Sequence, residues 1–203
     1  LGPGDYSLIS QGALDALSAG SNVYLRTKKH PTVDQLKQKI EYIALDYFYE
    51  NGEDFEQVYN KIAEFIIEKG KSEELVYAVP GHPRVAEKTV GIIEALAKEN
   101  NIELDIIPSM SFVDAMYNYL GVDPAEGFKL LDAFELEESY IDSSTNTIIT
   151  QIYDPFIASN VKLKLMEYYD DEHEVCIVNG AGIKELESKI YVKLYELDRH
   201  TEL

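Results

Sequence analysis

Apolar side chains recur along the chain with two periods, one typical of helices and one typical of buried strands. The clearest helical stretch covers residues 55–69, where Asp54 can cap the first turn and Gly70 follows the last. Shorter helical patterns cover a segment that Gly20 closes and residues 32–40, 85–98, 111–120 and 156–168. Apolar runs that predict strands cover residues 22–25, 42–45, 75–79, 102–107, 128–131, 147–152, 174–178 and 190–195.

This alternation of strands and helices predicts an α/β fold with a largely parallel sheet. The second half of the chain is more mixed in its pattern. We therefore expect two α/β lobes, residues 1–110 and residues 111–203, joined near residues 108–112. Together they would form one ligand-binding domain.

The charge balance excludes several classes of partner. The 203 residues include 18 Lys and Arg against 37 Asp and Glu, a formal net charge of −19. An acidic surface repels phosphate backbones and anionic lipid, so we expect neither a nucleic-acid nor a membrane partner. No apolar stretch approaches the roughly 20 residues of a membrane helix.

Cys176 is the only cysteine, so no internal disulfide can form and a reducing cytoplasm fits best. It stands in an apolar run, where burial makes a thiol inert. No leader resembling a signal peptide opens the sequence. Because the chain begins at Leu1 without Met, we expect further residues before it.

Four segments of small side chains open the chain or follow predicted strands: residues 2–5, 80–83, 108–111 and 179–182. Ligands of open α/β sheets bind beyond the carboxyl ends of strands, where glycine allows close approach to the backbone. None of the four segments has a phosphate-binding glycine pattern. We therefore expect a ligand held by backbone amides and carbonyls, although a glycine-rich turn is more often only a turn.

Side-chain chemistry gives few further candidates. Of the four histidines, only His82 lies in one of these loops, and a hydrogen-bonding role is favoured over acid–base catalysis. The acidic pairs at 73–74 and 137–138 are better explained as solvated surface than as metal ligands. The tyrosines at 117, 119 and 153 could line a cleft, but such spacing is more typical of a core. We expect no metal and assign no catalytic residue.

The opening Leu1-Gly2-Pro3-Gly4-Asp5 resembles that of the tetrapyrrole (corrin/porphyrin) methylase family. Residues 79–83 resemble that family's Gly-Asp-Pro loop, with His82 in place of the acid. Residues 108–112 and 179–182 are similar to its third and fourth loops. Residues 77–90 look closest to the branch that forms the N-terminal domain of MazG-type nucleoside-triphosphate pyrophosphohydrolase fusion proteins.

The resemblance implies a two-lobed fold with S-adenosylmethionine in a cleft between the lobes. It implies direct displacement of the sulfonium methyl group by a small-molecule acceptor, with rate supplied largely by positioning. It also implies a homodimer, and residues 195–197 closing over the adenine. The residues expected to contact the cofactor are Pro3, Gly81, His82, Val85, Ser111, Phe112, Ile152 and Ala181.

The cationic residues bear on the acceptor. A polycarboxylate such as uroporphyrinogen calls for many arginines, and this chain has only Arg26, Arg84 and Arg199. Further local cations at Lys28, Lys29 and Lys88 are few. The first hypothesis is thus an S-adenosylmethionine-dependent methyltransferase whose acceptor is unidentified, with a tetrapyrrole-like molecule as one candidate.

The alternative is a catalytically silent ligand-sensing domain that regulates a fused pyrophosphohydrolase. Such a hydrolase carries Glu-rich Mg²⁺-binding helices, which do not occur before Leu203. We therefore expect the hydrolase beyond the C-terminus.

Overall fold

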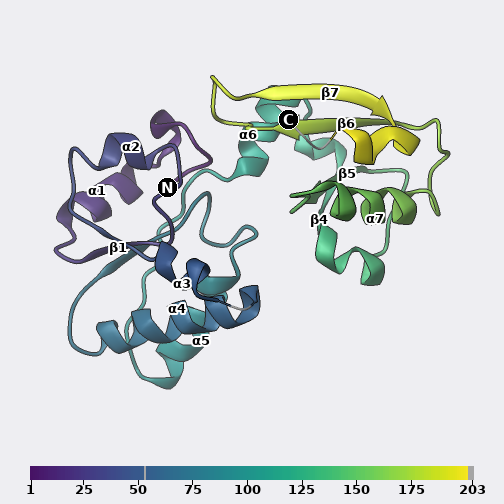
Figure 1. Cartoon of the computed structure of the whole chain (residues 1–203). Coiled ribbons are helices and arrows are strands. Elements are labelled where there is room, and N and C mark those ends of the chain that lie inside the picture. Colours follow the sequence, from purple (N-terminus) through teal and green to yellow (C-terminus); the bar gives the residue numbers. More distant parts are fainter. Residues whose placement is uncertain (53, 201–203) are drawn as a thin grey trace. The chain divides into compact units, whose positions relative to one another are not determined.

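The computed structural model describes residues 1–52 and 54–200, which form two compact units (Figure 1). The first unit comprises Leu1–Ala115 together with Gly182–Lys184. The second comprises Met116–Ala181 and the chain from Glu185 onward. The two predicted lobes, residues 1–110 and residues 111–203, are each one continuous segment, and this division stays a prediction.

A parallel sheet of three short strands organises the first unit. Its order is β2-β1-β3, with β1 (Val23–Leu25) between β2 (Ile43–Ala44) and β3 (Val76–Ala78). All three strands end at the same edge, so the segments that follow them lie where α/β proteins bind ligands.

Side chains on β1 alternate between two apolar layers, as the pleat of a strand requires. Tyr24 packs with residues of α4 (Phe55–Gly70) and α5 (Lys88–Glu99), which lie side by side in Figure 1. Val23 and Leu25 face the opposite layer. That layer includes residues of α1 (Gln11–Ala19) and α2 (Val33–Leu36). The remaining elements of this unit are the 3-10 helix η1 (Tyr6–Leu8), α3 (Asp46–Glu50) and the first turn of α6 (Phe112–Leu120).

Local signals place the main helices. The Asp54 carboxylate accepts a hydrogen bond from the Gln57 amide at 2.7 Å and caps α4, as predicted. Ser10 caps α1 by accepting from the Ala13 amide. The caps satisfy amides that the first turn of a helix leaves unpaired.

In the second unit, two pairs of strands and one long helix surround a separate apolar core. In it β4 (Phe128–Asp132) runs parallel to β5 (Asn146–Thr150), and β6 (Glu174–Asn179) antiparallel to β7 (Ser188–Lys193). The helix is α7 (Pro155–Leu165). The unit also includes the part of α6 from Met116 onward and three 3-10 helices: η2 (Pro124–Glu126), η3 (Ala133–Glu138) and η4 (Leu194–Arg199). The buried core residues are Leu136, Ile141, Val161, Leu165, Leu194 and Leu197.

Cys176 is half-buried on β6. Burial raises the pKa of its thiol, so the thiolate form is disfavoured. This agrees with the inert role predicted for it.

Several local predictions are wrong. Residues 102–107 form no strand, because they follow the turn that ends at Asn101 (φ 54°), residues 103–105 are all exposed, and no strand among the described residues pairs with them. The helix predicted over 85–98 begins only at Lys88, after Ala86 at φ 53°. The helix predicted over 32–40 keeps only the four residues of α2. Helix α3 was not predicted, since five residues show no clear period.

Within the described part of the chain, no helix combines the length and the apolar character that crossing a membrane requires.

Candidate functional site

The opening loop, residues 2–5, contacts the loop after β3, which begins at Pro80, through the main chain. Gly2 and Gly81 form an isolated antiparallel bridge, in which the Gly81 amide donates to the Gly2 carbonyl at 2.8 Å. Their φ angles are 70° and 67°, a region that favours glycine. A Cβ atom on Gly2 would lie 2.7 Å from the Leu8 carbonyl oxygen, so only glycine fits there.

A buried hydroxyl fixes the other end of the opening loop. Thr32 has no exposed surface, and its Oγ1 donates to the Gly4 carbonyl at 2.7 Å. Its side chain makes no capping bond to α2, although the residue stands at the N-cap. The hydroxyl therefore serves the loop rather than the helix.

The third predicted loop is tied to the start of α1. The Ser10 hydroxyl donates to the Pro108 carbonyl at 2.8 Å, and the Ser10 amide donates to the Ser109 hydroxyl at 3.3 Å. Ser111 and Asp114 then form a reciprocal cap on α6, with the Ser111 amide 2.8 Å from the carboxylate. Ser111 is only 6% exposed.

Residues Gly182–Lys184 of the first unit pack on the opening loop as well. The Asp5 amide donates to the Gly182 carbonyl at 2.9 Å. A Cβ atom on Gly4 would lie 2.2 Å from the Ile183 side chain. Besides Thr32, three later segments of the unit thus contact residues 2–10: the loop after β3, residues 108–109 and residues 182–183.

His82 shapes the loop that contains it. Its Nδ1 accepts a hydrogen bond from the Arg84 amide at 3.0 Å, and its carbonyl accepts from the Val85 amide at 3.0 Å. The imidazole therefore helps to form a turn, which agrees with the hydrogen-bonding role predicted for it.

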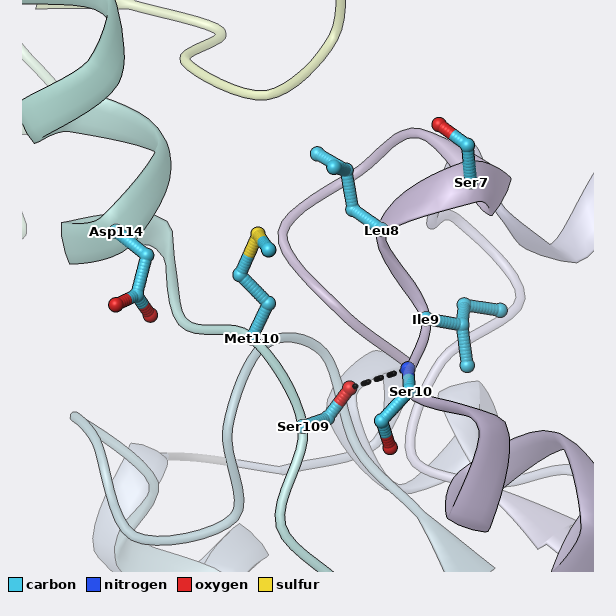
Figure 2. A pocket seen from close by; sticks show the side chains of 7 residues that line it. All are labelled: Ser7, Leu8, Ile9, Ser10, Ser109, Met110 and Asp114. Atoms are coloured by element: carbon cyan, nitrogen blue, oxygen red, sulfur yellow. Dashed lines mark hydrogen bonds between the residues drawn. The ribbon is translucent and has the colours of Figure 1, made fainter.

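A pocket of about 370 Å³ opens beside the first and third loops (Figure 2). The Ser10–Ser109 hydrogen bond lies at its base, with the side chains of Leu8 and Met110 above it. None of the predicted cofactor contacts lines it, but Asp114 connects it to Ser111. Its lining residues are Ser7, Leu8, Ile9, Ser10, Ser109, Met110 and Asp114.

The predicted contact residues fall in both units. Six of them belong to the first unit: Pro3, Gly81, His82, Val85 and Ser111 on the loops just described, and Phe112 at the first position of α6. Ile152 and Ala181 belong to the second, where Ile152 packs partly against the core. Whether all eight contact one ligand stays a prediction. Sequence reasoning missed Ser10 and Thr32, although a serine just before a helical pattern is a recognisable cap.

The fold and these loops define a class: an α/β protein whose small-residue loops gather at the carboxyl edge of a parallel sheet. Residues 1–198 match the family Tetrapyrrole (Corrin/Porphyrin) Methylases, and the chain belongs to that family.

Among curated proteins, the chain is 40% identical over 204 residues to the uncharacterized protein YabN of Bacillus subtilis (strain 168). The match covers 100% of this chain and 42% of YabN. The chain therefore spans less than half the length of that relative.

Solved structures show the same fold at low sequence identity. A uroporphyrin-III-C-methyltransferase from Thermus thermophilus aligns with a TM-score of 0.71 at 16% identity, covering 97% of this chain and 83% of that one. A Thermus thermophilus uroporphyrin-III C-methyl transferase complexed with S-adenosyl homocysteine aligns with a TM-score of 0.68 at 16% identity, covering 100% of this chain and 89% of that one. A diphthine synthase aligns with a TM-score of 0.64 at 19% identity, covering 98% of this chain and 82% of that one.

Replacing Thr32 by Val tests the hydroxyl that holds the opening loop. The change keeps the shape of the side chain but leaves the buried Gly4 carbonyl without that donor, which costs about 1–3 kcal/mol. We expect urea unfolding to show this loss. Thr145→Val is the matched control, because its hydroxyl bond is only part-buried and is long, at 3.3 Å. Equal losses in the two variants would contradict the assigned role.

We expect the stability of the first unit to depend on pH because of His30. Burial lowers the pKa of His30 from 6.5 to about 4, although contact with the Gly2 backbone opposes the shift, and Nδ1 makes no hydrogen bond. Between pH 6.5 and 4 the unfolded chain therefore binds more protons, so stability falls as the pH falls through this window. The loss is of the order of 1–3 kcal/mol.

Urea titrations of the wild type and of His30→Gln from pH 7.5 to 4 measure this contribution. We expect the wild type to lose stability more steeply than the variant between pH 6.5 and 4, and with the same slope above pH 7. Parallel curves throughout would show that His30 titrates normally.

Proposed function

We propose that the chain is an S-adenosylmethionine-dependent methyltransferase domain that acts on a small-molecule acceptor. The observation that carries the proposal is the set of hydrogen bonds joining residues 2–10 to residues 81, 108–109 and 182 at the carboxyl edge of the sheet, through the main chain and two serine hydroxyls. Membership of the methylase family and the neighbour complexed with S-adenosyl homocysteine support it.

The geometry at Gly81 fits a ligand that approaches the backbone closely. A Cβ atom built on Gly81 meets no atom within 4 Å, so space lies open directly above the loop. The loops offer amides and carbonyls rather than charged side chains. Such groups suit the adenine, ribose and amino-acid parts of S-adenosylmethionine, which need many hydrogen bonds and little net charge.

In this proposal the residues that hold the cofactor are Pro3, Gly81, His82, Val85, Ser111 and Phe112 from the first unit, and Ile152 and Ala181 from the second. Bound S-adenosylmethionine supplies a methyl group on a sulfonium that a nucleophilic acceptor atom can attack. The chain itself orients the reactants and keeps water away. Alignment of this kind contributes about 7–11 kcal/mol in favourable cases.

The arginines restrict the acceptor. Arg26 pairs with Glu87, Arg84 with Glu94 at 2.8 Å, and Arg199 lies 4.0 Å from Glu196. Each of the three therefore already lies beside a glutamate, and Arg26 is mostly buried with its partner. A polycarboxylate would compete with these glutamates, so we propose an acceptor with fewer carboxylates than a uroporphyrinogen.

A second candidate is a ligand-sensing domain of a longer protein that carries a MazG-type pyrophosphohydrolase. The observation that favours it is the length of YabN, of which this chain matches only 42%. Homodimer formation and a cytoplasmic location belong to both candidates as proposals. The two differ in whether a methyl group leaves the cofactor, which transfer from radiolabelled S-adenosylmethionine to cell-extract metabolites would measure.

Cofactor binding can be tested by filling the space above Gly81. Gly81→Leu places a side chain where no protein atom lies, and we expect calorimetry to show loss of S-adenosyl homocysteine binding. Gly121→Leu is the matched control, because Gly121 also has a positive φ, 73°, and open space around its Cβ position. Both variants should lose about 1–3 kcal/mol of stability from backbone strain.

The proposal predicts that only Gly81→Leu stops binding. If the wild type gives no heat with millimolar S-adenosyl homocysteine, the proposed cofactor is wrong. If Gly81→Leu binds as tightly as Gly121→Leu, the loop is not part of the site.

A further inference from the structure

A buried ion pair joins the end of β1 to the start of α5, outside the predicted cofactor contacts. Arg26 follows β1, and its Nη1 donates to Oε2 of Glu87. The side chain of Glu87 is 2% exposed and that of Arg26 is 22% exposed. Glu87 also closes the loop that begins at Pro80 and contains Gly81 and His82.

Glu87 uses both carboxylate oxygens. Oε1 accepts from the Thr89 amide at 3.1 Å and from the Thr89 hydroxyl at 2.6 Å, which caps α5. Oε2 takes the bond from Arg26. One side chain therefore fixes the start of the helix and attaches it to the sheet.

Arg26 is held in turn on several sides. Its backbone amide donates to the Ala78 carbonyl at 2.9 Å, which places it beside β3. Its Nε donates to the Tyr49 hydroxyl at 2.7 Å. The guanidinium carbon lies 5.8 Å from the ring centre of Tyr49 and 5.7 Å from that of Tyr59, within cation–π range. The guanidinium therefore has a defined position.

The pair adds little to the net stability of the fold, because moving two charges out of water costs much of the free energy that their attraction returns. A role in holding the loop of residues 80–87 explains the pair better. Between Gly81 (φ 67°) and Glu87, the chain turns through Ala86, which has a positive φ of 53° without being glycine. A backbone in this region persists only where surrounding contacts hold it.

We propose that Arg26 and Glu87 are a positioning pair that fixes the loop of residues 80–87 in the conformation that binds the cofactor. Other contacts described for this loop are the Gly81–Gly2 hydrogen bond, the turn that His82 forms with Arg84 and Val85, and the Arg84–Glu94 pair, which is exposed on both sides. Of the ion pairs at this loop, Arg26–Glu87 is thus the buried one. The part of the inference that concerns affinity rests on the proposed cofactor site, whereas the part that concerns the loop does not.

The test compares Glu87→Gln with Glu94→Gln in the full chain. In Glu87→Gln the side-chain oxygen can still accept from the Thr89 amide, but an NH₂ group turns toward Arg26, so the helix cap survives and the pair is broken. Glu94→Gln breaks an ion pair of the same helix at the surface. The double variant Arg26→Met/Glu87→Gln removes both charges and provides a folded comparison without an unpaired buried charge.

Hydrogen exchange measured by mass spectrometry reports on the loop without any ligand. We expect exchange in peptides covering residues 80–90 to rise at least about tenfold in Glu87→Gln and in the double variant, equivalent to about 1.4 kcal/mol. Glu94→Gln should exchange like the wild type. Ile62→Ala, a change at a fully buried position of α4, controls for a general loss of stability. In this variant, exchange in residues 80–90 should rise no more than exchange in the rest of the unit.

Calorimetry with S-adenosyl homocysteine reports on affinity. We expect a dissociation constant about tenfold weaker or more in Glu87→Gln, and an unchanged constant in Glu94→Gln. Unchanged exchange in residues 80–90 would overturn the inference, as would faster exchange with wild-type affinity. If the wild type itself does not bind, the proposed cofactor fails, and the exchange result alone decides whether the pair fixes the loop.

Discussion

The hydrogen bond from the Gly81 amide to the Gly2 carbonyl, 2.8 Å long, is the contact on which the candidate site depends. It joins the opening loop to the loop after β3, and both residues need the positive φ that glycine adopts at little cost. Thr32 fixes the same opening loop from beneath through Gly4, and Gly182 accepts from Asp5 on another side. If this hydrogen bond broke, Thr32 and Gly182 would still hold the opening loop, but the loop would no longer be joined to the loop after β3.

A site made of main-chain groups suits the charge of this chain. With a formal net charge of −19, the surrounding field opposes the binding of an anionic ligand. Each arginine lies beside a glutamate, and the most buried of these pairs, Arg26–Glu87, closes a loop. The charge of the chain therefore favours recognition through amides and carbonyls over recognition of many carboxylates.

The sequence alone predicts the features that depend on local chemistry. The apolar stripe and the Asp54 cap identify α4 to within a residue, and the glycine-rich segments identify the loops that meet at the sheet edge. Contacts between distant residues could not be predicted in this way. Thr32 and Glu87 look like ordinary helix-start residues, and only the fold brings them to Gly4 and Arg26. The false strand over 102–107 has the same cause, because an apolar run becomes a strand only where a partner strand is free.

We infer that the opening loop brings the other loops together into one ligand site. A titration of the ¹⁵N-labelled protein with S-adenosyl homocysteine, followed by amide chemical shifts, tests it most directly. We expect the amides of Gly2, Gly4, Asp5, Gly81, Ser109–Ser111 and Gly182 to shift together with one dissociation constant. Shifts confined to other surfaces, or loops that respond with different constants, would contradict it.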